Sequence, residues 1–96
     1  MSGLLGGILA GTLRSEMKGR VDEILKCGKE WNATARELTE ALKELTAAVK
    51  QGNVSPSTVK PMVASSKVLA VKTAKLTRAF ETYEVTMKDI MTRVGL

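Results

Sequence analysis

The sequence predicts an all-α fold, a long antiparallel helical hairpin of the coiled-coil type that is completed by packing with other subunits. Apolar side chains recur at alternating spacings of three and four residues from Met17 to Val49 and again from Val59 to Val94. This 3.5-residue period is typical of the seam between supercoiled helices. Residues 51–58 separate the two tracks and are rich in turn-forming residues, so we expect one helix to fold back on the other.

The length of the chain predicts a single domain over residues 1–96. A two-helix hairpin of this size cannot bury a compact core or enclose an active site by itself. We therefore expect partner helices to complete it, and contacts with copies of itself or with another large molecule to be its function.

The first 13 residues are uncharged and apolar, and Gly3, Gly7 and Gly11 follow one another at intervals of four. On a helix these glycines form a smooth stripe, a glycine zipper, against which another helix can approach closely. The glycines of this segment cost roughly 3–4 kcal/mol of helix stability relative to alanine, so we expect a partner to hold it. We favour a buried assembly segment over a shallow membrane contact, because no lysine lines a polar face.

The same segment does not resemble a targeting signal. No base precedes Arg14, whereas a secretory signal begins with positive charge. Thirteen apolar residues are also fewer than the roughly 20 that span a bilayer. The sequence leaves the location unknown; a virion or an extracellular filament follows if the chain assembles, and the cytoplasm otherwise.

The first long helix is expected over about residues 14–51. Three successive heptads, KEWNATA, RELTEAL and KELTAAV, each open with a base, an acid and a large residue of the track. Two interpretations remain open: a solvated charged surface, or columns that set the register between neighbouring subunits. The base column contains Lys29, Arg36, Lys43 and Lys50, and the acid column contains Glu23, Glu30, Glu37 and Glu44.

A turn is expected over residues 52–57 and a second helix over about 58–94. Gly52 can adopt the left-handed conformation that ends a helix. Pro61 favours a helix start at Ser57 or Thr58, because proline is tolerated in the first turn but disrupts a helix that began earlier.

The second helix is unusually basic, since residues 51–80 contain no acid. The outer positions of its first half form a predicted basic stripe, namely Lys60, Lys67, Lys75 and Arg78. Such a stripe can neutralise phosphates of nucleic acid, or it can face the glutamate column of a neighbouring subunit or solvent. Val68 and Val71 point outward beside it, which suggests more than one contact surface.

The residue types present argue against catalysis. The chain has no histidine and one cysteine, Cys27, which excludes zinc clusters, disulfide frameworks and Cys/His nucleophile pairs. We expect Cys27 to be a small buried side chain beside the seam. The sequence thus predicts no enzyme, no catalytic, cofactor or metal site, and no small-molecule substrate.

Three short features resemble the needle subunits of type III secretion systems: ELTEAL at residues 37–42, the loop at Ser55-Pro56, and TMKDIM at residues 86–91. The resemblance covers about the last 60 residues and implies a helical hairpin that polymerises into a hollow filament. In general plan the chain is also similar to small helical-hairpin coat proteins of filamentous or archaeal viruses, by analogy of architecture.

The leading hypothesis from the sequence is a structural subunit that self-assembles into a helical filament or shell, most naturally a virion coat. A secretion-needle-type subunit is one alternative, and a small basic nucleic-acid-binding or regulatory four-helix-bundle dimer is another. The residues predicted to mediate assembly are Gly3, Gly7, Gly11, Trp31, Val68 and Val71.

Overall fold

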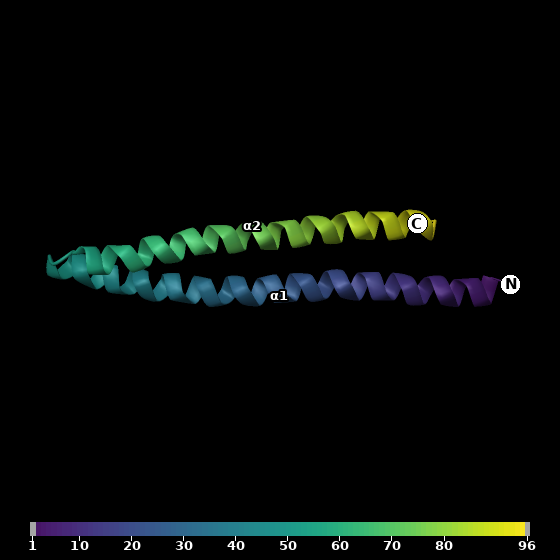
Figure 1. Ribbon diagram of the computed structural model, residues 1–96, viewed down its shortest axis with the longest axis horizontal. Coiled ribbons are helices and arrows are strands. Elements are labelled where there is room, and N and C mark those ends of the chain that lie inside the picture. Colours follow the sequence, from purple (N-terminus) through teal and green to yellow (C-terminus); the bar gives the residue numbers. More distant parts are fainter. Residues whose placement is uncertain (1, 96) are drawn as a thin grey trace.

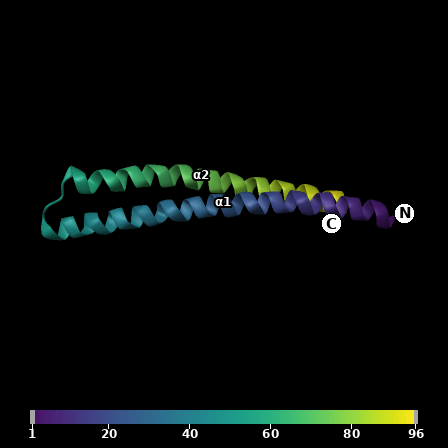
Figure 2. The same ribbon diagram turned by 60° about the horizontal axis from the view of Figure 1, so that its bottom comes forward.

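The computed structural model is a two-helix antiparallel hairpin, which confirms the predicted fold class (Figure 1). It describes the backbone of residues 2–95 and the side chains of residues 11 and 13–95. Helix α1 spans Ser2–Gln51 and helix α2 spans Pro56–Arg93. The rod measures 76 × 16 × 16 Å, with the turn at one end and the start of α1 and the end of α2 at the other (Figure 2).

Helix α1 begins at Ser2 and therefore includes the glycine-rich segment, although the sequence placed the start of the long helix near residue 14. Leu13 is 8% exposed at the junction, so the inward face continues through it. Gly11 is exposed, and a Cβ added there would meet nothing within 4 Å. The side chains predicted for a glycine zipper at residues 3 and 7 lie outside the described residues.

The two helices pack through one seam whose positions follow the heptad letters a and d. Position a is large and half-buried on α1, and position d is small and buried. On α1, a comprises Ile24, Trp31, Leu38 and Leu45, and d comprises Cys27, Thr34, Ala41 and Ala48. On α2, a comprises Met62, Leu69, Leu76, Tyr83 and Ile90, and d comprises Ser65, Lys72, Ala79 and Thr86.

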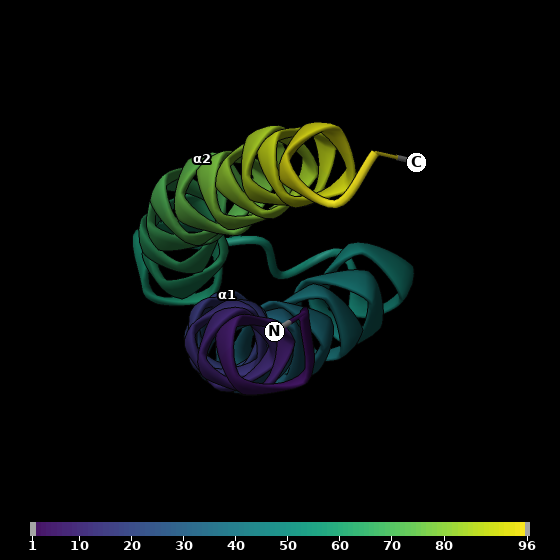
Figure 3. The same ribbon diagram turned by 90° about the vertical axis from the view of Figure 1, so that its right-hand side faces the viewer.

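This seam corrects one detail of the sequence analysis. The apolar track paired each a residue with the residue four positions later, position e, whereas the seam uses the residue three positions later, which is small at each of these positions on α1. Leu42, Val49 and Phe80 are 44%, 61% and 51% exposed. Alanine, cysteine and threonine at d let the helices approach closely, so the bulkier e residues lie beside the seam. Seen along the rod, each helix is inclined to the long axis (Figure 3).

The turn between the helices begins with the C-terminal cap that glycine permits. Gly52 has φ +72, its N–H donates to Val49 O at 3.2 Å, and the N–H of Asn53 donates to Ala48 O at 3.0 Å. This pair of bonds is the Schellman motif, which satisfies carbonyls at the end of α1. The left-handed conformation predicted for Gly52 is confirmed.

Helix α2 begins at Pro56 and not at Ser57 or Thr58. Ser55 is its N-cap, with φ −141 and ψ 165, and its backbone N–H donates to the Thr58 hydroxyl at 3.1 Å. Proline suits the first helical position because its φ is already helical. Pro61 consequently lies in the second turn, where the hydrogen bond it cannot donate is lost at an exposed position.

Candidate assembly surface

The two sides of the seam carry different chemistry. In an antiparallel pair the g positions of both helices lie on one side of the seam, and the e positions lie on the other. We call the g side the charged groove and the e side the apolar flank.

The charged groove is hollowed and lined by ionised side chains. A hollow of about 390 Å³ lies between Glu23 and Glu30 of α1 and Lys75 and Arg78 of α2, with Cys27 also in its lining. A second hollow nearer the turn is lined by acids of α1 at 37, 40 and 44, together with Pro61 and Ser65. Acids of α1 thus face bases or neutral residues of α2 along this side.

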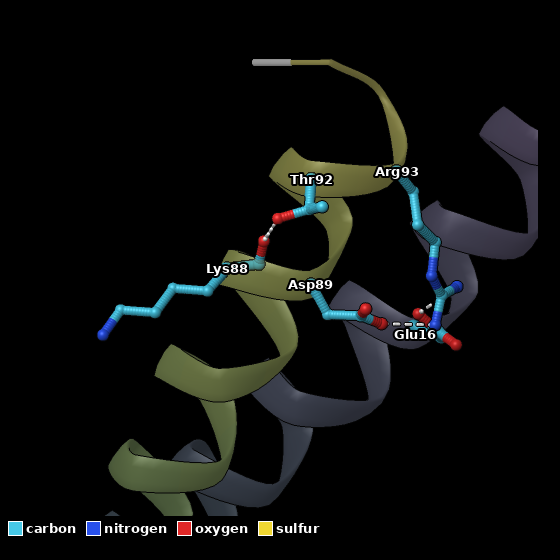
Figure 4. Close-up of polar contacts among 5 residues, drawn as sticks. All are labelled: Glu16, Lys88, Asp89, Thr92 and Arg93. Atoms are coloured by element: carbon cyan, nitrogen blue, oxygen red, sulfur yellow. Dashed lines mark hydrogen bonds and ion pairs between the residues drawn. The ribbon is translucent and has the colours of Figure 1, made fainter.

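Ion pairs close the groove at two levels. Lys72 Nζ lies 3.5 Å from Glu30 Oε2, with side chains 25% and 38% exposed. Near the open end, Arg93 of α2 reaches back to Glu16 of α1 at 3.5 Å and also pairs with Asp89 on its own helix (Figure 4). The groove therefore has partners of opposite charge within the hairpin itself.

The apolar flank, in contrast, has no ion pair that joins the two helices, because its residues are uncharged. From Val21 to Val49 on α1 and from Val59 to Val94 on α2, none of its positions is charged. Five of its large residues, Val21, Leu42, Val49, Phe80 and Val94, are between 42% and 61% exposed, whereas Val59 and Met87 are half-buried. The flank consists of Val21, Gly28, Ala35, Leu42 and Val49 on α1, of Val59, Ser66, Thr73, Phe80 and Met87 on α2, and of Val94, which caps the end of α2.

Trp31 marks the border between the seam and the apolar flank. Its indole N–H donates to the Thr73 hydroxyl at 2.9 Å, and that hydroxyl donates to Leu69 O at 2.8 Å. This bond joins the two helices on the flank side. Leu25 and Val63, at the b positions next to the flank, are 56% and 37% exposed and widen the apolar surface.

The predicted assembly residues are distributed over different surfaces. Trp31 is half-buried in the hairpin, whereas Val68 and Val71 are 46% and 55% exposed on the groove side of α2. Leu42, Val49 and Phe80 are not among the assembly residues that the sequence predicts, because the apolar period places them in the seam. The exposed fraction of their side chains is the signal that identifies them.

The predicted basic stripe is divided in the structure. All four of its residues are exposed, but Lys75 and Arg78 line the charged groove across from Glu23 and Glu30. Lys60 and Lys67 occupy the outermost f position, farthest from the seam. The base column of α1 occupies the f position of its own helix, so the outer edges of both helices are basic in the half of the rod near the turn.

Cys27 is 6% exposed, as expected for a small side chain at the seam. Burial and the nearby charges of Glu23 and Glu30 raise the pKa of its thiol above the ordinary 9.0. The thiol is thus protonated at neutral pH, which is the inert form. Within the described residues, no group of three acidic, cysteine or histidine side chains is arranged to hold a metal ion.

Comparisons with protein-family models, with curated proteins and with solved structures found no match for this chain. Over the part of the chain that the structure describes, no helix is both long and apolar enough to cross a membrane.

Proposed function

We propose that the protein is a structural subunit that self-assembles through helix packing into a helical filament or shell. The observation that carries this proposal is the poor burial of its large apolar side chains. No described side chain is less than 2% exposed, while Phe80 and Val49 remain more than half exposed. Burying one such side chain fully contributes about 1.5–3 kcal/mol, so packing several against other copies is strongly favourable.

A virion coat is the most natural form of this subunit. The long rod offers separate contact surfaces, with the apolar flank on one side and the exposed Val68, Val71 and Val85 on the groove side of α2. Distinct surfaces allow contacts that do not close on themselves, as a filament or shell requires. A secretion-needle-type filament uses the same property. On this proposal the protein is located in a virion or in an extracellular filament.

Sedimentation velocity and electron microscopy of the purified protein test the proposal. We expect particles much larger than a few chains, with a population that grows with protein concentration. Filaments would distinguish the needle-like and filamentous versions from a shell. A single species of one or two chains at every concentration up to the millimolar range would contradict self-assembly into such structures.

A second candidate is a nucleic-acid-binding four-helix-bundle dimer, which is favoured by the basic outer edges of the rod. Lys60 and Lys67 are exposed and spaced seven residues apart, or about 10 Å along the helix. Phosphate contacts of this kind weaken steeply with salt. The logarithm of the binding constant falls with the logarithm of the salt concentration, with a slope of roughly 0.9 per phosphate contacted.

The test is duplex DNA binding by the double variant Lys60→Glu with Lys67→Glu, measured against salt. We expect the slope of the logarithm of the binding constant against the logarithm of the salt concentration to fall by about 2, because two phosphate contacts are lost. The matched control is Lys75→Glu with Arg78→Glu, which makes the same charge change beside the acids of the groove and should lower the slope less. Equal effects of the two double variants, or no binding by the unaltered protein, would contradict this candidate.

A further inference from the structure

The apolar flank leaves large side chains exposed on both helices on the same side of the hairpin, most of all Val49 and Phe80. We propose that it is the site at which a second copy of this chain docks, so that two hairpins pair into a four-helix bundle. This inference rests on the proposed self-assembly and names the surface with which assembly begins.

The width of the apolar sector supports a bundle over an isolated hairpin. A two-helix seam requires apolar residues at a and d only, whereas helices that face a bundle core carry a third apolar position at e or g. Here position e is uncharged on both helices and carries large apolar residues towards its ends, with Leu42 on α1 and Phe80 on α2 among them, while Ser66 and Thr73 interrupt it on α2. The hairpin covers a and d, and e remains to be covered.

Charge favours a second copy as the occupant. When a surface pairs with its own copy across a two-fold axis, residue i meets residue j and j meets i, so any charge on the surface would need an opposite charge elsewhere on it or be buried unpaired. The apolar flank carries no charge between Val21 and Val94 on either helix. The charged groove does not have this property, and Lys72 and Arg93 on it already pair with acids of α1 within the hairpin.

The area is sufficient for a stable pair. The stretch from Val21 to Val49 is about 42 Å long at 1.5 Å per residue, and the rod is 16 Å wide. Their product is about 670 Å² per copy, or about 1,300 Å² in total, which falls within the range of specific interfaces, about 1,200–2,000 Å². Side chains that project from the helices increase this area further.

Trp31 offers a direct test, because it is the one tryptophan of the chain and lies at the edge of the flank. The experiment measures acrylamide quenching of Trp31 fluorescence in the purified full chain from nanomolar to high micromolar concentration. Sedimentation measures association in parallel. We expect quenching of Trp31 fluorescence to fall over the concentration range in which the chains associate. Association with unchanged quenching would show that the hairpins meet through another surface and would overturn the inference.

Two single variants separate the flank from the groove. Leu42→Glu places a charge on the flank at a side chain that is 44% exposed, and Val85→Glu makes the same change on the groove side of α2 at 67% exposure. We expect Leu42→Glu to weaken pairing by at least about 100-fold, since an unpaired charge would be buried, and Val85→Glu to leave pairing within a few-fold. Phe80→Glu repeats the test on α2, and circular dichroism verifies that each variant is helical.

The outcomes distinguish this inference from the proposed function. A stable pair that Leu42→Glu separates, without larger particles, supports the docking site and contradicts the filament or shell. Large particles that withstand both Leu42→Glu and Phe80→Glu but not Val85→Glu support self-assembly and overturn the docking site. Phosphatidylcholine vesicles are included, and binding of the unaltered chain to them in place of pairing would also overturn it.

Discussion

The apolar flank and the charged groove differ in how far the hairpin satisfies them. In the groove, Lys72 meets Glu30 and Arg93 meets Glu16 within one chain. On the flank, Leu42, Val49 and Phe80 remain between 44% and 61% exposed. Because both sides border the same seam, the comparison shows that ion pairs between the helices satisfy charges of the groove within one chain, whereas large apolar side chains of the flank stay exposed.

The largest effect that we expect tests why the bulky residues lie on the flank. Ala41 is 6% exposed at a d position of the seam, so Ala41→Leu should wedge the helices apart and lower the free energy of unfolding by about 1–3 kcal/mol. Urea denaturation at fixed protein concentration measures this difference. A leucine accepted at Ala41 without loss would mean that the seam has room for large side chains.

The matched control for that variant is Ala47→Leu, six residues further along the same helix. Ala47 is exposed, and the added side chain should change the free energy of unfolding by no more than about 0.5 kcal/mol. If both leucines destabilise equally, the effect does not come from the seam, and the explanation for the exposed flank fails.

The next effect concerns the hydrogen bond at the edge of the apolar flank. Removing the bond between the Trp31 indole and the Thr73 hydroxyl should cost about 1 kcal/mol, and the flank would lose its polar link between the helices. A double-mutant cycle with Trp31→Phe and Thr73→Val isolates this coupling from the change in size. Additive single effects would show that the bond contributes nothing to stability.

The sequence predicted the hairpin, its turn and the cap at Gly52, because these depend on local patterns within a few residues. It did not predict the rotation of the seam. At an a position such as Ile24, both a small partner three residues on, Cys27, and a flank residue four residues on, Gly28, fit an apolar period. The choice depends on how closely two helices approach across the molecule, which is a property of the pair.

The candidate surface was harder to predict for the same reason. Val68 and Val71 were identified as outward by elimination from the track, and they are exposed. The 3.5-residue period assigns Leu42 and Phe80 to the seam, because both continue the apolar track. Once the small d residues occupy the seam, these side chains become a surface, and periodicity alone cannot make that distinction.

A smaller effect is expected from the charged groove. Glu30→Gln removes the ion pair with Lys72, whose side chain is 25% exposed, and should lower the free energy of unfolding by less than about 1 kcal/mol, with less effect at high salt. Asp22→Asn, which breaks the more exposed pair with Lys18, is the control and should have a smaller effect. Thermal denaturation at low and high salt makes the comparison, and a larger loss at Asp22 would contradict internal satisfaction of the groove.

The smallest effect that we expect is the pH dependence contributed by Cys27. Because burial raises the pKa of this thiol in the folded protein above 9.0, the folded state binds the proton more tightly than the unfolded state. Its contribution to stability is therefore complete below pH 9.0 and is lost as the pH rises through the folded pKa. The difference in the free energy of unfolding between the unaltered protein and Cys27→Ala should shift against the unaltered protein between pH 7 and pH 10. Other groups titrate in both proteins and cancel in the difference, so a difference that is constant with pH would mean that the thiol at the groove edge is not shielded from water.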